Sequence, residues 1–217
     1  MRPRLPEPCL CLVTDRSIGE ETTLVSRVAE AVAGGVDLVQ LREKDLSGGR
    51  LLELAASLKE AIGGSALLII NERVDVAVAC GAPGVQLGEE ALPVAAARHI
   101  LGAHALIGRS VHSAEGAAQA IVQGADFLVV GTMYATRSHP RVRPAGPGLV
   151  QRIAPNCPVP LIGIGGINTA NVAKVLQAGA QGVAVITSIL GARRPGEAAW
   201  QLKQVMLAAW KASRAAS

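Results

Sequence analysis

Three polar residues that could hold an anion follow the second apolar run of the chain. Gln40, Arg42 and Lys44 occupy every second position there. Alternation along an extended strand sends Gln40 and Arg42 to one face and brings Lys44 to the rim. Two cations and an amide can therefore converge on one anion, and arginine suits a bidentate contact with phosphate. For this segment alone, a solvated cluster of charged surface residues is the alternative interpretation.

Carboxylates follow the next two apolar runs. Glu72 comes directly after Asn71, and Glu89 and Glu90 follow Gly88. Carboxylates at neighbouring strand ends can hold Mg²⁺ together with the phosphates of a substrate, because Mg²⁺ usually takes only one or two protein oxygens. Glu89 and Glu90 also fit the first turn of a helix, where acidic side chains complement the helix dipole. For these two residues the helical role is the favoured interpretation.

Hydroxyl, imidazole and cationic side chains follow the fifth and sixth apolar runs. Ser110 suits a hydrogen bond to a ligand, while His112 suits either acid–base chemistry or packing against a helix start. The sixth run leads into the longest irregular stretch, residues 135–148, which is typical of a loop that closes over an anion. A merely solvated loop is the alternative. Its hydroxyl, imidazole and cationic side chains include Thr136, Arg137, Ser138, His139, Arg141 and Arg143.

Glycines and a short polar segment follow the last two apolar runs. Gly165 and Gly166 let backbone N–H groups approach a phosphate. A single glycine pair is a weak signal, but Ile186, Thr187 and Ser188 follow the eighth run, where a barrel of parallel strands often completes such a site. Together the two segments predict a phosphate-binding site.

The elements that must position these residues are eight short runs of Val, Leu and Ile. Each run is continuous rather than alternating, as expected of parallel strands buried on both faces. Amphipathic stretches such as residues 22–33 and 51–62 separate them. The 217 residues therefore predict a single-domain (β/α)8 TIM barrel with its core at about residues 9–203. The expected strands are residues 10–14, 38–42, 67–71, 84–88, 106–111, 127–133, 159–166 and 182–189.

An internal repeat supports the same fold. Gly34, Gly81, Gly124 and Gly179 each end a helical stretch just before the second, fourth, sixth and eighth strand. A doubly wound open sheet could use the same unit. It would usually show fewer strands and a glycine-rich turn after the first one, where this chain has Thr-Asp-Arg at residues 14–16.

Composition excludes several classes of protein. The formal net charge of +4 is spread along the chain and aromatic residues make up only 2%, so no basic patch with stacking side chains indicates nucleic-acid binding. The apolar runs are too short to span a bilayer and no signal-peptide pattern is present, which predicts a cytoplasmic protein. The four cysteines lack metal-ligand spacing and are expected to be reduced thiols. Self-association into a homo-oligomer is left open.

Seven segments resemble, in order and spacing, the thiamine phosphate synthase and thiazole tautomerase superfamily, with the closest overall match to the synthases. The resemblance covers residues 10 to about 202. The segments are residues 40–44, 71–75, 84–88, 110–113, 131–140, 163–167 and 182–185.

The resemblance implies an enzyme that joins a pyrimidine diphosphate to a thiazole phosphate with Mg²⁺, releasing pyrophosphate. It implies catalytic roles for Arg42, Lys44, Ser110 and His139, and a Mg²⁺ ligand at Glu72. Arg42 and Lys44 would bind the diphosphate, Asn71 and Ser110 the pyrimidine, and the loop with the last two strands the thiazole phosphate. The implied substrate-binding residues are Gln40, Leu41, Arg42, Glu43, Lys44, Asn71, Ser110, Thr136, Arg137, Ser138, His139, Gly166, Ile186 and Thr187.

The chain departs from the synthase pattern at four positions. Glu72 replaces an aspartate, and Ala91 replaces a second one, for which Glu90 or Glu89 is the candidate substitute. Gln86 replaces a histidine, and His139 replaces a lysine. The tautomerase branch also lacks the Mg²⁺ aspartates. A tautomerase-like isomerase and a non-catalytic thiazole phosphate-binding paralogue are therefore the alternative predictions.

Overall fold

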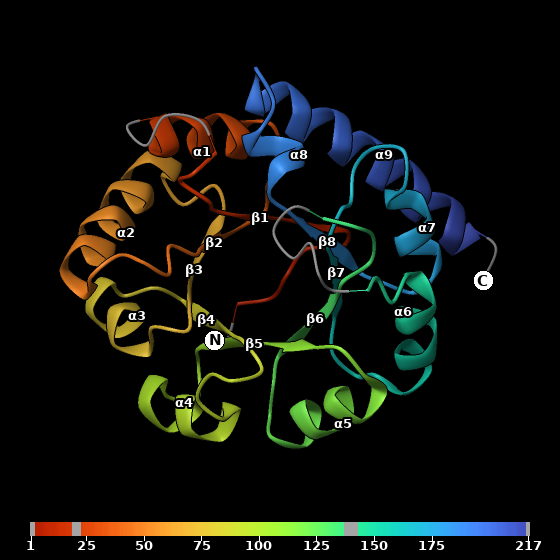
Figure 1. The fold of residues 1–217 in the computed structure, drawn as a ribbon, viewed down its shortest axis with the longest axis horizontal. Coiled ribbons are helices and arrows are strands. Elements are labelled where there is room, and N and C mark those ends of the chain that lie inside the picture. The colour runs from red at the N-terminus through yellow and green to blue at the C-terminus, as the bar shows by residue number, and fades with distance from the viewer. Residues whose placement is uncertain (1–2, 19–22, 137–142, 216–217) are drawn as a thin grey trace.

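The computed structural model describes residues 3–18, 23–136 and 143–215. Eight parallel strands form a closed barrel in sequence order, with β8 paired to β1 (Figure 1). This arrangement confirms the predicted TIM barrel. The strands are β1 (Cys9–Val13), β2 (Leu38–Leu41), β3 (Leu67–Asn71), β4 (Gly84–Leu87), β5 (Leu106–Val111), β6 (Phe127–Gly131), β7 (Leu161–Ile164) and β8 (Gly182–Val185).

Helices surround the barrel as an outer ring (Figure 1). The last helix, α9, packs against α1 and α7 and so covers the seam where the barrel closes. Among the described residues no helix is both long and apolar enough to cross a membrane. The helices are α1 (Leu24–Ala33), α2 (Gly48–Ile62), α3 (Val74–Cys80), α4 (Val94–Leu101), α5 (Ala114–Val122), α6 (Pro147–Ile153), the 3-10 helix η2 (Ala154–Asn156), α7 (Val172–Gln177), α8 (Thr187–Leu190) and α9 (Pro195–Ala215).

Two apolar layers explain why the strands are continuous apolar runs. Leu10 and Leu12 of β1 pack outward against the helices. Cys9, Cys11 and Val13 pack inward in a smaller cluster inside the barrel. Both faces of each strand are therefore buried, as parallel barrel strands require.

The inner face changes from apolar to polar along β2 and β3. In β3 the inward cluster residue Ile69 is followed two positions later by Asn71, and in β2 Leu38 is followed by Gln40. The apolar residues fill the interior at the amino ends of the strands. The polar residues therefore gather inside the barrel mouth at the carboxyl ends, where TIM barrels carry their sites.

Three predicted strands extend too far by two residues or more. The sixth ends at Gly131 rather than residue 133, and the seventh covers only Leu161–Ile164 of the expected residues 159–166. The eighth ends at Val185, because Thr187–Leu190 form the short helix α8 and bury Ile189 and Leu190 against the core. A short apolar run does not distinguish a strand from a buried helical turn.

The glycine repeat has the predicted role. One glycine in each copy has a positive φ angle: Gly35 (107°), Gly81 (63°), Gly124 (88°) and Gly179 (106°). These positions suit glycine because its lack of a Cβ allows the left-handed backbone that ends a helix and redirects the chain.

Candidate functional site

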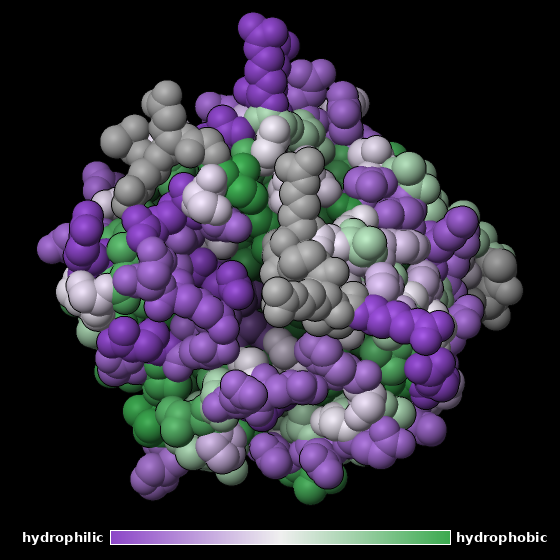
Figure 2. All heavy atoms as spheres, viewed as in Figure 1, coloured by the Kyte–Doolittle hydropathy of each residue, from purple (hydrophilic) through white to green (hydrophobic). Residues whose placement is uncertain are grey.

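A cavity of about 610 Å³ opens at the carboxyl ends of the strands. In Figure 2, which shows this end of the barrel, hydrophilic residues gather on the side where α2 and α3 lie. Side chains or backbone from all eight strand ends line the cavity. The predicted site residues among them are Gln40, Arg42, Lys44, Asn71, Glu72, Ser110, Thr136, Gly166, Ile186 and Thr187.

The end of β2 supplies the cations. Gln40, Arg42 and Lys44 line the cavity, as the alternation in the sequence predicts. Lys44 Nζ lies 3.7 Å from Glu72 Oε1, whereas the Arg42 guanidinium makes no ion pair within the described residues. Within the described part of the chain, no carboxylate therefore has to be displaced from Arg42 before a phosphate binds to its guanidinium.

Leu41 and Glu43 do not line the cavity, and their assignment as substrate-binding residues stays a prediction. Leu41 is fully buried in the layer between barrel and helices. Glu43 is also buried, and its carboxylate accepts hydrogen bonds from Thr14 Oγ1 (2.6 Å) and Arg16 N (3.2 Å). The two residues occupy the odd positions of the segment, so they point outward while their even-numbered neighbours point into the barrel.

Two glutamine side chains orient the hydrogen-bonding groups of Asn71 in β3 and Ser110 in β5. Gln40 Nε2 donates to Asn71 Oδ1 (2.9 Å), and Gln86 Nε2 donates to Ser110 Oγ (3.1 Å). Asn71 therefore keeps its amide N–H groups, and Ser110 its hydroxyl proton, for a bound molecule. The middle of the cavity thus presents neutral hydrogen-bond donors.

Among the described residues, the ends of β6, β7 and β8 supply a region without charged side chains. Gly165 and Gly166 have φ angles of 106° and 61°. Tyr134 N donates to the Gly165 carbonyl (2.9 Å), so the segment after β6 lies against the segment after β7. Thr136 and Thr187 line the cavity beside these glycines. Glycine backbone and hydroxyl groups are typical of phosphate sites in this position of the barrel.

Within the described ranges, the carboxylates that line the cavity are those of Glu72 and Glu89. Glu89 Oε1 lies 3.4 Å from His112 Nδ1, which also lines the cavity. Glu90 is exposed outside it, and Ala91 packs partly buried against the core. If a second carboxylate substitutes for the one missing at Ala91, the structure favours Glu89 over Glu90.

The comparisons with known proteins agree with this geometry. A sequence model of the family described as thiamine monophosphate synthase matches residues 10–189. The chain belongs to this family. The thiamine-phosphate synthase of Methanoculleus marisnigri is 42% identical over 92% of this chain and 96% of its own length. That of Gloeobacter violaceus is 41% identical over 94% of this chain, which spans 60% of that longer protein.

A solved structure gives the same result. Thiamine phosphate pyrophosphorylase from Pyrococcus furiosus superposes with a TM-score of 0.85 at 34% identity, covering 93% of this chain and 96% of that chain. At this identity the likeness extends beyond the shared barrel architecture to the family itself.

Three of the predicted site residues of this family member, Arg137, Ser138 and His139, lie outside the described residues. Their assignment as substrate-binding residues stays a prediction. Thr136, immediately before them, lines the cavity.

The sequence prediction missed several residues of the cavity wall. Gln86, Gly88 and Thr132 line the cavity but were not among the predicted site residues. Gln86 and Gly88 could have been found by the alternation that identified Gln40 and Arg42, because both lie at inward-facing positions around the end of β4. Thr132 follows the last residue of β6, where no alternation remains to indicate its direction.

Proposed function

We propose that this cavity joins hydroxymethylpyrimidine diphosphate to thiazole phosphate, forming thiamine phosphate and pyrophosphate. Membership of the thiamine monophosphate synthase family makes the chain a transferase of thiamine biosynthesis. The observation that best supports the proposed reaction is the presence of two regions suited to phosphate within one cavity. One is cationic, at Arg42 and Lys44, and the other is formed by glycine backbone and hydroxyls after β6 to β8.

The positions of the two regions suit two substrates. In a closed barrel of eight strands in sequence order, β2 lies across from β6 and β3 across from β7. We assign the diphosphate to the cations of β2 and the thiazole phosphate to the segments after β6, β7 and β8. The pyrimidine then lies between them, where Asn71 and Ser110 can donate hydrogen bonds to it.

The reaction breaks the bond between the pyrimidine methylene carbon and the diphosphate oxygen, and the electron pair leaves with pyrophosphate. The thiazole nitrogen supplies the electron pair of the new carbon–nitrogen bond. Arg42 and Lys44 would stabilise the negative charge that develops on the leaving pyrophosphate. The methylene carbon can then develop positive charge before the nitrogen attacks.

We further propose that the site uses Mg²⁺, with Glu72 as a ligand and Glu89 as the second available carboxylate. Mg²⁺ prefers oxygen ligands and usually takes one or two carboxylates together with substrate phosphates and water. The described residues hold no group of three or more metal-ligating side chains, and a site completed by the diphosphate needs none. When bound, Mg²⁺ would neutralise charge on the diphosphate. Homo-oligomeric assembly and a cytoplasmic location stay predictions.

The direct test is an assay with purified protein, both substrates and Mg²⁺, measuring thiamine phosphate and pyrophosphate together. A tautomerase would instead interconvert thiazole phosphate isomers without the pyrimidine. A binding paralogue would bind thiazole phosphate without turnover. Either of these outcomes would reject the synthase proposal.

The diphosphate assignment is tested by Arg42→Ala. Loss of one hydrogen bond to a charged group, about 1.5 to 3 kcal/mol, lowers kcat/KM for the pyrimidine diphosphate by roughly 10- to 150-fold. Arg152→Ala is the matched control, because Arg152 is exposed in the last turn of α6 and does not line the cavity. Equal activity of the two folded variants would reject the assignment.

A further inference from the structure

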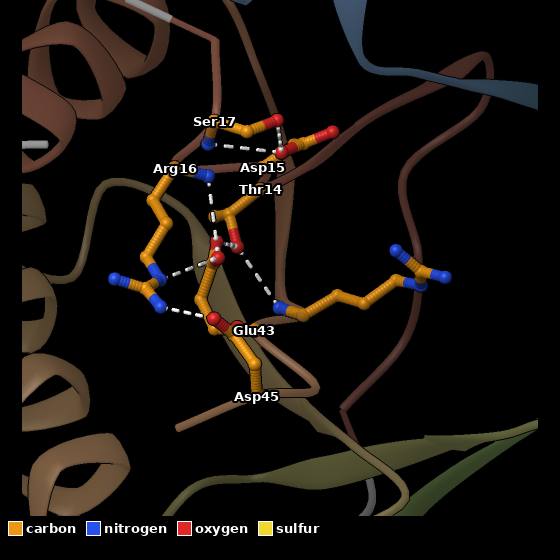
Figure 3. A network of polar contacts seen from close by, with 7 residues as sticks. Thr14, Asp15, Arg16, Ser17, Glu43 and Asp45 are labelled. Carbon is orange, nitrogen blue, oxygen red and sulfur yellow. Dashed lines mark hydrogen bonds and ion pairs between the residues drawn. The ribbon is translucent and has the colours of Figure 1, made fainter. Parts of the chain in front are cut away.

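A buried hydroxyl and a buried carboxylate connect the end of β1 to the end of β2 (Figure 3). Thr14 is fully buried and Glu43 is 6% exposed. Thr14 Oγ1 donates to Glu43 Oε1 (2.6 Å) and accepts from the main-chain N–H of Arg42 (2.9 Å). The other carboxylate oxygen accepts from Arg16 N (3.2 Å) and lies 3.7 Å from Arg16 Nε. Arg16 also pairs with Asp45.

The carboxylate determines the direction of the hydrogen bond that reaches Arg42. A hydroxyl has a single proton, and an ionised carboxylate can only accept. Because Thr14 gives its proton to Glu43, its lone pairs are left for the Arg42 N–H. The chain of contacts therefore runs from Glu43 through Thr14 to the backbone of a cavity-lining residue.

This contact extends the strand pairing beyond the end of the β1–β2 ladder. The last registered pair of that ladder is Val13 with Gln40. Thr14 N still donates to the Gln40 carbonyl (3.0 Å), and the Thr14 side chain then holds the N–H of Arg42. Backbone pairing thus ends where the cationic segment begins, and a side chain takes over the role of the neighbouring strand.

The network is not explained by stability alone. Burial raises the pKa of Glu43, although its hydrogen bonds with Thr14 and Arg16 oppose that rise. A charged carboxylate in this position therefore carries a desolvation penalty that its partners only partly offset. A residue that fixes functional geometry can be retained in spite of such a penalty.

We propose that Thr14 and Glu43 are positioning residues for pyrophosphate binding, holding the backbone of Arg42 so that its guanidinium enters the cavity at a fixed place. The inference rests on the proposed role of Arg42 in binding the diphosphate. Neither residue lines the cavity, so both act through Arg42 rather than by touching substrate.

Titration calorimetry with inorganic pyrophosphate at constant Mg²⁺, and separately with thiazole phosphate, tests the proposal. Thr14→Val keeps the shape and removes the hydroxyl, and Glu43→Gln keeps the size but offers only one acceptor oxygen. Both variants should weaken pyrophosphate binding by about tenfold, the effect of losing roughly one hydrogen bond. Thr14→Ser should restore binding, and thiazole phosphate affinity should stay unchanged in every variant.

The matched control is Asp37→Asn. Asp37 is another partly buried carboxylate that holds β1, but at its amino end, where Oδ2 accepts from Leu10 N (2.7 Å) and pairs with Lys203 Nζ (2.5 Å). Asp37→Asn removes the charge of this carboxylate and should lower thermal stability without changing pyrophosphate affinity. If Asp37→Asn weakens pyrophosphate binding as much as Glu43→Gln, the effect is a general loosening of the barrel and the proposal is overturned.

Arg42→Ala separates failure of this inference from failure of the proposed function. If Arg42→Ala weakens pyrophosphate binding while Thr14→Val and Glu43→Gln do not, the positioning role is wrong and the diphosphate site stands. If Arg42→Ala itself binds as the parent does, the diphosphate assignment is wrong. Should Thr14→Val fail to fold, Glu43→Gln decides the question, since it preserves the size of the buried side chain.

Discussion

Gly166 offers a sharp test of the glycine segment after β7, because its backbone angle and its surroundings both oppose a side chain. Its φ is 61°, a left-handed conformation that costs a non-glycine residue about 1 to 2 kcal/mol. A Cβ there would lie 2.5 Å from the Ala135 carbonyl oxygen and 2.9 Å from Tyr134 Cβ. Relieving such crowding by moving backbone costs a further 1 to 3 kcal/mol or so.

Gly63 is the matched control, since it has the same strain without the crowding. Its φ is 54°, it caps α2, and a Cβ there would have nothing within 4 Å. Alanine also reduces the entropy of the unfolded chain, which returns about 0.4 to 1 kcal/mol in both variants. Gly63→Ala should therefore lower the unfolding free energy by about 1 kcal/mol, and Gly166→Ala by about 2 to 4 kcal/mol.

Thermal denaturation and substrate binding measure the two effects. For a domain of this size, 1 kcal/mol corresponds to about 2 to 4 °C in Tm, so Gly166→Ala should lower Tm clearly more than Gly63→Ala. The displaced atoms of Gly166→Ala belong to the segment that leads to Thr136, so this variant alone should raise KM for thiazole phosphate. Identical Tm and KM values for the two variants would refute the geometry argued for this segment.

Three further predictions follow from charge and burial. Glu72→Gln should raise the Mg²⁺ concentration that gives half-maximal synthase activity, whereas Glu90→Gln, outside the cavity, should not; equal curves for both variants would remove Glu72 from the metal site. Burial raises the pKa of Glu43, so as pH rises from 4.5 the unfolded chain loses this proton before the folded chain does. The parent should therefore lose stability relative to Glu43→Gln as pH rises. Urea denaturation of both proteins from about pH 4 to 7 measures this, and a constant difference in stability would contradict it. Burial raises the pKa of Cys11 to about 12, so maleimide at about pH 8 should modify the partly exposed Cys80 and spare Cys11 in the native protein. Peptide mapping that finds Cys11 modified would contradict this expectation.

The barrel could be predicted from the sequence because burial on both faces leaves a strong signal in each strand. The same property hides which face is which. Cys9 and Leu10 are both apolar and both buried, yet one packs inside the barrel and the other against the helices. Only where polar residues appear, as at Gln40 and Arg42, does alternation show which side chains enter the barrel.

Site residues could be predicted where strand alternation determines the direction of a side chain. They could not be predicted where that direction depends on contacts with residues distant in the sequence. Gln40, Arg42 and Lys44 were identified by their spacing alone, and all three line the cavity. Glu43 was grouped with them because it shares the segment. Its partner Thr14 is 29 residues away in the chain, and no local pattern connects the two residues.

The polarity of the cavity also depends on contacts between residues that are distant in the sequence, such as Gln86 and Ser110. Gln86 Nε2 donates to the Leu87 carbonyl (3.3 Å) as well as to Ser110 Oγ. Reversing the amide would place two carbonyl oxygens together, so the Leu87 contact fixes its orientation. The amide fits because residue 108 is glycine: a Cβ there would lie 2.1 Å from Gln86 Oε1. Gly108 inside β5 thus makes room for Gln86 of β4, whose amide donates to Ser110 and leaves the Ser110 hydroxyl proton free to be donated. The middle of the cavity, between the two phosphate-binding regions, is therefore suited to a ligand that offers hydrogen-bond acceptors.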